Sequence, residues 1–291
     1  MRDLLKADLR RMFRDKLFLI AVIIGGALAI FTPLLYKGLM VILDVAADTG
    51  DLFDGLFTSK MVLGSSFAPM NNYGLILPIF LAIIIYKDFS YGTIRNKIIS
   101  GKSRVSIYLS LLLSSAIVMT ICMLGYALIQ FGFASLLLDY SIGVKMVEDL
   151  PYIILTLLFG VICYLFITSI IVFLCASFKN VGLAIVLYFG GCFLLTILAT
   201  ITSTAYSAIE MLEGKEALKN VFEFLTNINL FYFLNGVIGY VDEYLNTEIA
   251  YIIIDSILFG GLFVLFGISS FLVKNNFQFF FRYLYSLELE G

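Results

Sequence analysis

Long apolar stretches and short polar ones alternate along the whole chain. Six of the apolar stretches reach about twenty residues or more, the length of α-helix that crosses a hydrocarbon core ~30 Å thick. Apolar residues run continuously within them, whereas the strands of a membrane barrel would alternate. The pattern therefore predicts an all-α polytopic membrane protein with six membrane-spanning helices, at residues 17–36, 67–86, 105–133, 151–178, 181–203 and 249–273.

The composition agrees with this class of protein and narrows its chemistry. The chain is 61% hydrophobic and 14% charged, whereas a soluble domain is about 45–50% apolar and about 25% charged. The four cysteines lie inside apolar stretches without CxxC spacing, and histidine is absent, which removes the usual metal ligands and His-based triads. We expect a single transmembrane domain over residues 1–291, with no catalytic site, no metal and no nucleic-acid partner.

Lys and Arg are distributed unequally between the two sets of polar segments. Residues 1–16, 87–104, 179–180 and 274–291 hold 14 of the 19 cations, and the segments on the opposite side hold 5. Because cytoplasmic loops carry the excess of Lys and Arg, both termini and residues 87–104 are expected on the cytoplasmic side.

Residues 1–16 have the spacing of a cationic amphipathic helix. Four cations recur at four-residue steps, and apolar residues occupy the other face. We predict an interfacial helix whose cations lie near anionic headgroups. The alternative is a signal peptide, which the length of the following apolar stretch disfavours. The cations are Arg2, Lys6, Arg10 and Arg14, and the apolar residues are Leu5, Leu9, Met12 and Phe13.

The basic segment, residues 87–104, separates the second and third predicted spans. It holds five cations and one acid, Asp88, and Tyr91, Ile94 and Ile98 recur at helical spacing. Such a helix could fill a groove on a soluble partner with its apolar face. The alternative is a loop that lies on anionic lipid. Residues 100–103 resemble the end of a P-loop, but Asn96 replaces the required first glycine and no strand precedes it.

Two polar regions are expected on the outer side. Residues 37–66 are acidic and predict an external loop. Residues 204–248 begin as a charged amphipathic helix and continue in an apolar run at 228–241, which is too short to span the membrane and predicts a re-entrant or interfacial element between the last two spans.

Few polar groups lie inside the predicted spans. Asp255 and Gln130 are candidates for lining a transport pathway, but one intramembrane acid is little for an ion-coupled carrier. The driving energy is therefore expected from outside the membrane. Small residues that could let a second subunit approach closely are Ala21, Gly25, Ala29, Gly182, Gly190 and Gly191, with packing inside the chain as the alternative for the first three.

The basic segment resembles the membrane subunits of type-2 ABC exporters. Many such permeases of Gram-positive bacteria carry an acid, a Gly-Thr pair and a basic stretch between their second and third spans, as Asp88, Gly92-Thr93 and the following cations do here. The layout is similar too: an N-terminal elbow helix, six spans and a hydrophobic re-entrant element.

The resemblance implies a permease of the bacterial cell membrane that exports a peptide, antibiotic or lipid-like substrate. It would have no ATPase domain, would pair with a second copy or a paralogue, and would work with two separate ATPase subunits that bind ATP and Mg. The elbow helix, with Arg2, Lys6, Arg10 and Arg14, would also contact the ATPase. An ion-coupled carrier or channel without an ATPase is the alternative. The residues implied in ATPase coupling are Asp88, Tyr91, Gly92, Thr93, Ile94, Arg95, Lys97, Ile98, Gly101 and Arg104.

Overall fold

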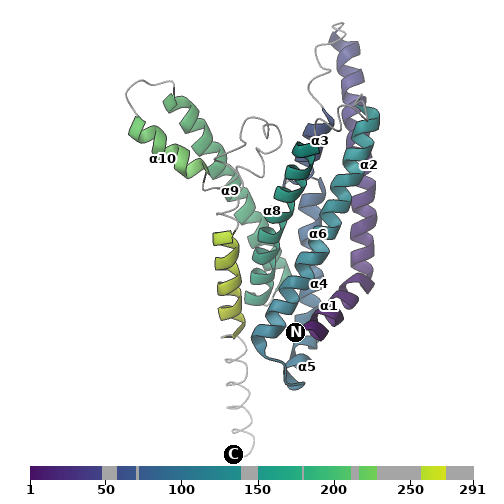
Figure 1. Cartoon of the computed structure of the whole chain (residues 1–291), viewed down its shortest axis with the longest axis vertical. Helices are drawn as coiled ribbons and strands as arrows, with labels where there is room; N and C mark the ends of the chain where they lie inside the picture. Colours follow the sequence, from purple (N-terminus) through teal and green to yellow (C-terminus); the bar gives the residue numbers. More distant parts are fainter. Residues whose placement is uncertain are drawn as a thin grey trace, which may run out of the picture.

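Helices make up the regular structure of the described chain (Figure 1). The computed structural model describes residues 1–47, 58–69, 72–138, 150–178, 180–210, 216–227 and 257–272. The helices are α1 (Arg2–Arg14), α2 (Lys16–Ala47), α3 (Ser59–Ser65), α4 (Asn72–Ser90), α5 (Thr93–Ile99), α6 (Arg104–Leu137), α8 (Leu150–Ser177), α9 (Val181–Glu210), α10 (Glu216–Asn227) and an unlabelled helix, Ile257–Leu272.

Five of these helices are long and apolar enough to cross a membrane, which confirms a multi-pass, all-helical membrane protein. Their apolar parts are Lys16–Ile42, Tyr73–Ser90, Arg104–Leu137, Ile153–Ser177 and Val181–Ile209. The sixth predicted span, 249–273, is described only over Ile257–Leu272, which is shorter than a full crossing. The predicted re-entrant run 228–241 and the C-terminal segment lie outside the described residues.

The region between the first two spans differs from the external loop that we predicted. Residues 37–47 continue α2, because Leu39–Leu43 extend its apolar pattern before Asp44. Further on, Thr58 caps α3, because its hydroxyl accepts a hydrogen bond from the Met61 backbone. Val62 and Leu63 of α3 are buried in the bundle. The prediction of a loop was wrong at residues 37–47 and 59–65. Polar residues in this region predicted a loop, although the apolar residues between them form helices.

The centre of the bundle is formed by α6 and α8, with α4 against both. Side chains from all three share one buried cluster, including Leu81, Leu111, Met119, Ile167 and Val172. Helix Ile257–Leu272 packs on α8 through Phe263, whose ring lies 6.0 Å from that of Phe166. By contrast, the outward sides of α2 and α9 expose many large apolar side chains. In a bilayer such faces can contact lipid without the cost that water would impose.

Helix α2 approaches α4 closely along the stripe of small residues. Ala21 and Ala29 are buried, and a Cβ added to Gly25 would lie 2.7 Å from Cζ of Tyr73. The Tyr73 ring packs in turn on Tyr126 of α6, with 5.0 Å between ring centroids. The structure thus shows the packing inside the chain that was the alternative for this stripe, and the subunit contact stays a prediction. The glycines of α9 (Gly182, Gly190 and Gly191) remain exposed.

Replacing Gly25 with alanine should destabilise the bundle, because the new methyl group would overlap the buried Tyr73 ring. Overpacking of this kind costs about 1–3 kcal/mol. Gly26→Ala is the matched control, since a Cβ there meets nothing within 4 Å. We expect a lower thermal unfolding midpoint in detergent for Gly25→Ala only. Equal midpoints for the two variants would contradict the close α2–α4 contact.

Candidate functional site

The basic segment forms a short helix between two tight turns. Chain reversal at both ends of α5 uses glycines in the left-handed region, Gly92 at φ 69° and Gly101 at φ 80°. Residues with a Cβ adopt this conformation only at a cost. The helix begins at Thr93 and ends at Ile99, and Ser103 then caps α6 by accepting a hydrogen bond from the Ser106 backbone at 3.2 Å. The Gly-Thr pair therefore begins a short helix within the segment whose spacing predicted one.

The apolar face of α5 points into the protein, which changes the predicted docking surface. Ile94 is only 6% exposed, and Ile98 packs against the same core. The outward face carries Tyr91, which is 76% exposed, Arg95 and Ile99, which is 72% exposed. Arg95 and Ile99 lie one helical turn apart on α5 and share its outer side, while Tyr91 lies in the turn that precedes α5. Because the chain's own bundle already covers Ile94 and Ile98, these side chains need no partner protein to shield them from water.

Three ion pairs attach α1 to the basic segment. Lys97 Nζ lies 2.5 Å from Asp8 Oδ1, Arg11 pairs with Asp88, and Lys87 Nζ donates to both carboxylate oxygens of Asp15, at 2.8 and 2.7 Å. The pairs join positions 72 to 89 residues apart in the sequence. A site made of α1, the end of α4 and α5 is therefore assembled at one end of the bundle (Figure 1).

Two of the carboxylates in this cluster are buried. Asp8 is 2% exposed and Asp88 1% exposed, and the second oxygen of Asp8 accepts a hydrogen bond from Ser110 Oγ at 2.7 Å. A buried carboxylate is stable only with a cation or several hydrogen bonds, because desolvation costs several kcal/mol per ion. The pairing thus determines where α1 and α5 can lie relative to α6.

Asp15 also shapes the corner between α1 and α2. Its Oδ1 accepts a hydrogen bond from the Leu17 backbone at 2.9 Å. Partial burial works to raise the pKa of Asp15, but the hydrogen bonds from Lys87 and Leu17 and the charges of Lys87 and Arg11 outweigh it, so its pKa lies below the ordinary 3.8. Burial lowers the pKa of Arg11, against the opposing effect of Asp8 and Asp15.

The predicted coupling residues divide into two groups. Asp88, Ile94, Lys97 and Ile98 face the protein, while Tyr91, Arg95 and Gly101 face outward. Arg104 is half-buried and donates to the backbone oxygen of Leu272 at 3.4 Å, which links the start of α6 to helix Ile257–Leu272. Gly92 and Thr93 form the turn at the start of α5.

On α1 all four predicted cations, Arg2, Lys6, Arg10 and Arg14, are exposed. On the opposite face Met12 is buried, in agreement with the predicted apolar face, but Leu4 and Asp8 are buried beside it and Phe13 is 39% exposed, which differs from the prediction.

Sequence reasoning missed the residues that hold this site together, namely Asp8, Arg11, Asp15 and Ser110. A signal was present: Asp8, Arg11 and Asp15 are spaced by three and four residues, so they share one helical face on the side away from the cations. Their partners could not be read from the sequence, since they lie in another part of the chain.

The pathway candidate Gln130 lies inside the bundle and not on an open surface. It is fully buried, and its Oε1 accepts a hydrogen bond of 2.8 Å from Ser66 Oγ, just after α3. Beside this contact Phe67 packs tightly on Gly160 of α8. In this structure Gln130 therefore anchors the segment that follows α3. Asp255, the other candidate, lies outside the described residues.

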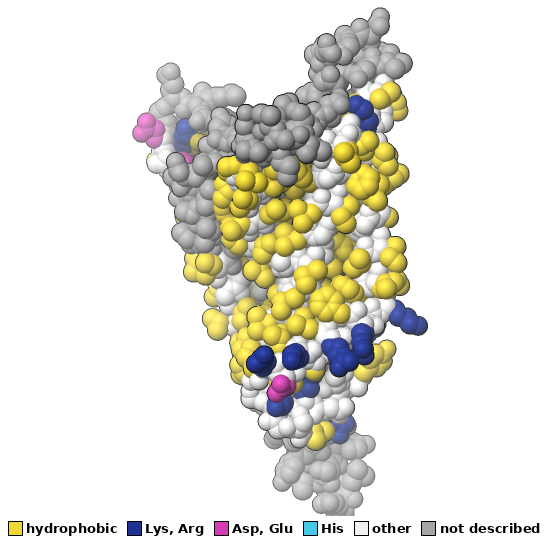
Figure 2. All heavy atoms as spheres, turned by 45° about the vertical axis from the view of Figure 1, so that its right-hand side comes forward, with side chains coloured by type: hydrophobic (Ala, Val, Ile, Leu, Met, Phe, Trp, Pro, Cys, Tyr) yellow, Lys and Arg dark blue, Asp and Glu magenta, His cyan; other side chains and the backbone are white. Residues whose placement is uncertain are grey.

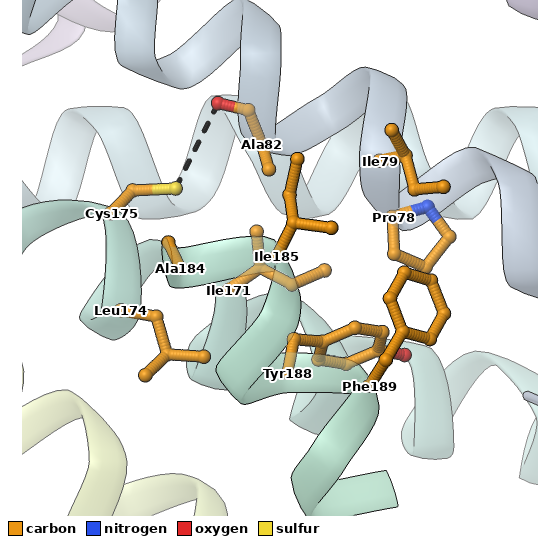
Figure 3. A pocket seen from close by; sticks show the side chains of 10 residues that line it. All are labelled: Pro78, Ile79, Ala82, Ile171, Leu174, Cys175, Ala184, Ile185, Tyr188 and Phe189. Atoms are coloured by element: carbon orange, nitrogen blue, oxygen red, sulfur yellow. Dashed lines mark hydrogen bonds between the residues drawn. The ribbon is translucent and has the colours of Figure 1, made fainter. Parts of the chain in front are cut away.

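A small apolar pocket lies between α4, α8 and α9 (Figure 3). Its cavity volume is only about 10 Å³, roughly the room for one water molecule, and Pro78, Ile171, Ile185 and Phe189 are among its lining residues. The Cys175 thiol points across it to the Ala82 carbonyl, at 3.8 Å. The lining has no carboxylate or cation, so it suits only an apolar group. Within the described part of the chain, no cluster of His, Cys, Asp or Glu could hold a metal ion.

No protein-family model matches this chain, and none of the curated proteins compared with it matches either.

Loss of the Lys97 cation should destabilise the protein strongly, because Asp8 would remain buried without its partner. Removing one member of a buried pair costs about 3–5 kcal/mol. We expect Lys97→Gln to lower the thermal unfolding midpoint in detergent, and the double variant Asp8→Asn/Lys97→Gln to recover part of the loss. Arg95→Gln, which removes an exposed cation from the same helix, should have little effect. A Lys97→Gln variant as stable as wild type would contradict the structural role of the pair.

The Asp15–Lys87 pair should make stability depend on pH only in acid. The folded-state pKa of Asp15 is lowered, so its contribution is complete above the unfolded-state value, near 3.8, and is lost as the pH falls through the lower folded-state pKa. The difference in unfolding midpoint between wild type and Asp15→Asn should be constant from about pH 7 to 5 and shrink below about pH 4. A difference that shrinks already between pH 7 and 5 would contradict this assignment.

Proposed function

We propose that this chain is the membrane permease subunit of a type-2 ABC-like exporter of a bacterial cell membrane. It would have six spans, cytoplasmic termini and a second copy or a paralogue as its partner permease. Two separate ATPase subunits would supply ATP hydrolysis. The observation that carries the proposal is α5, a short helix that the buried Lys97–Asp8 pair ties to α1 and that exposes Arg95 and Ile99, with Tyr91 exposed in the turn before it.

A transmitting element has to be rigidly attached to what it moves. The two glycine turns join α5 directly to α4 and α6, and the pairs of Asp8, Arg11 and Asp15 hold α1 against the same elements. A displacement of α5 would therefore be carried into three helices at once, instead of being absorbed by a flexible loop. This arrangement supports a coupling helix that receives force from a soluble subunit.

The outward face of α5 has the composition of a protein-binding surface. Tyrosine and arginine are enriched among the residues that dominate binding at interfaces, and apolar side chains form interface centres. Tyr91 and Ile99 are the large exposed apolar residues of this face, and Arg95 lies between them. The ATPase subunit would bind these residues. It would not bind Ile94 and Ile98, which are already packed against the bundle.

The scarcity of charged residues in the described membrane-spanning helices favours an energy source outside the membrane. In α4, α6, α8 and α9, the Lys, Arg, Asp and Glu side chains occur only near helix ends, and α8 has none. Ion-coupled carriers use ionisable or ion-coordinating groups near the membrane midplane. The lack of charge along the middle of these four helices suits an apolar or amphipathic cargo, such as a peptide, an antibiotic or a lipid-like molecule. The resemblance of the basic segment supplies the export direction.

The first test is whether a neighbouring reading frame encodes an ABC ATPase, whose absence would weaken the proposal; the second is co-purification and transport with that ATPase. We expect Tyr91→Glu/Ile99→Glu to reduce recovery of the ATPase and ATP-driven transport in proteoliposomes at least tenfold, since loss of an interface centre typically costs 2 kcal/mol or more. Both positions are exposed, so the fold should survive. Leu218→Glu/Val221→Glu is the matched control, because it places the same charges on exposed apolar positions of α10, at the other end of the bundle.

Undiminished ATPase recovery and transport by the α5 variant would refute the coupling assignment. Transport by the purified chain alone, driven by an ion gradient, would favour a secondary carrier or channel instead.

A further inference from the structure

Helix α1 presents a continuous cationic face away from the bundle. Arg2, Lys6, Arg10 and Arg14 are exposed at four-residue steps, a row that spans about 18 Å at the helical rise of 1.5 Å per residue. Among the described residues none of the four forms an ion pair. The side toward the bundle carries Leu4, Asp8 and Met12, which are buried.

The nearby acids that could neutralise the cations of this face form ion pairs on the inner side of α1 instead. Asp8 and Asp15 are paired with Lys97 and Lys87 on the inner side, and Asp3 is the one exposed acid of α1. The ion pairs that attach α1 to the bundle therefore leave an excess of positive charge on its outer surface. They also hold the row of cations in a fixed position, which lowers the entropy cost of binding an anionic surface.

The face lies where the apolar surface of the molecule ends. Lys and Arg side chains gather in a row along the border of the apolar belt, at the end of the bundle that carries α1 and α5 (Figure 2). Only Asp15 separates the end of α1 from the start of α2, whose exposed Leu19, Ile20 and Ile23 begin the apolar outer surface at once. Phe13 is exposed beside Phe18, with 5.0 Å between their rings. Lipid headgroups occupy this level of a bilayer.

We propose that the outward face of α1 is a binding site for the anionic headgroups of membrane phospholipids. A protein interface has an apolar or aromatic centre and a polar rim, which the α5 face offers, whereas charges run along the whole α1 face. Polybasic helices at a membrane surface gain about 1 kcal/mol per cation from anionic lipid. The inference does not depend on the exporter assignment, because it uses only α1 and its position.

The test uses the full-length chain purified in mild detergent, titrated with dioleoylphosphatidylglycerol or with zwitterionic dioleoylphosphatidylcholine. Lipid affinity is read from native mass spectra and from the rise in unfolding midpoint, since a ligand that binds the folded state stabilises it. Wild type should bind the anionic lipid more tightly. Lys6→Gln/Arg10→Gln should reduce that preference roughly tenfold or more, at about 1 kcal/mol per cation. In 1 M NaCl, where the screening length is about 3 Å, most of the preference should disappear.

The matched control is Arg95→Gln/Lys102→Gln, which removes two exposed cations from the basic segment at the same end of the molecule. It should keep the wild-type preference within about twofold, since these cations lie outside the α1 face. An equal loss in the control, no preference of wild type for the anionic lipid, or equal stabilisation by inorganic phosphate at the same concentration would each overturn the assignment of a lipid site to α1.

Discussion

The arrangement of this protein depends on the burial of two carboxylates, Asp8 and Asp88, where α1 meets the basic segment. Neither could remain ionised away from water without a cation, and the cations come from the opposite partner: Lys97 for Asp8, Arg11 for Asp88. Helix α1 and the basic segment thus each contribute one buried carboxylate and the cation that pairs with the carboxylate of the other. The interaction gives little net energy compared with apolar packing, but it admits very few relative positions of the two elements. It makes one rigid unit out of segments that hydrophobic packing alone would position less uniquely.

That rigid unit presents two outward surfaces of different chemistry. The surface of α1 carries a row of four cations and adjoins the apolar belt, which matches a membrane surface. The surface of α5 combines tyrosine, arginine and isoleucine, which matches a protein. Because the same ion pairs support both, lipid contact on one side and force from a soluble subunit on the other would act on a single body. This would allow the membrane to serve as the support against which α5 is moved.

Away from this end the bundle is held together differently. Water does not drive helices together inside a bilayer, so close packing and buried hydrogen bonds carry the specificity. Tyr73 lies against Gly25 where no side chain intervenes, and Ser66 and Gln130 form the hydrogen bond that keeps the segment after α3 within the bundle. Within the described part of the chain, the outer sides of α2 and α9 retain broad apolar surfaces.

The sequence by itself determined the class of protein, five of the crossing helices, and the helix that begins at Thr93, because each follows from a local property: the length of an apolar run, or the conformational freedom of Gly92. Only the tertiary structure decided that Ile94 points inward, that the small residues of α2 pack against Tyr73, and that Asp8 and Asp15 select Lys97 and Lys87. The physical reason is that a helix between lipid and protein is apolar on every side, so its pattern does not reveal which side meets a neighbour. The sequence does not reveal the ion pairs either. Any of several cations could pair with a given acid, and only folding determines which cation comes within reach.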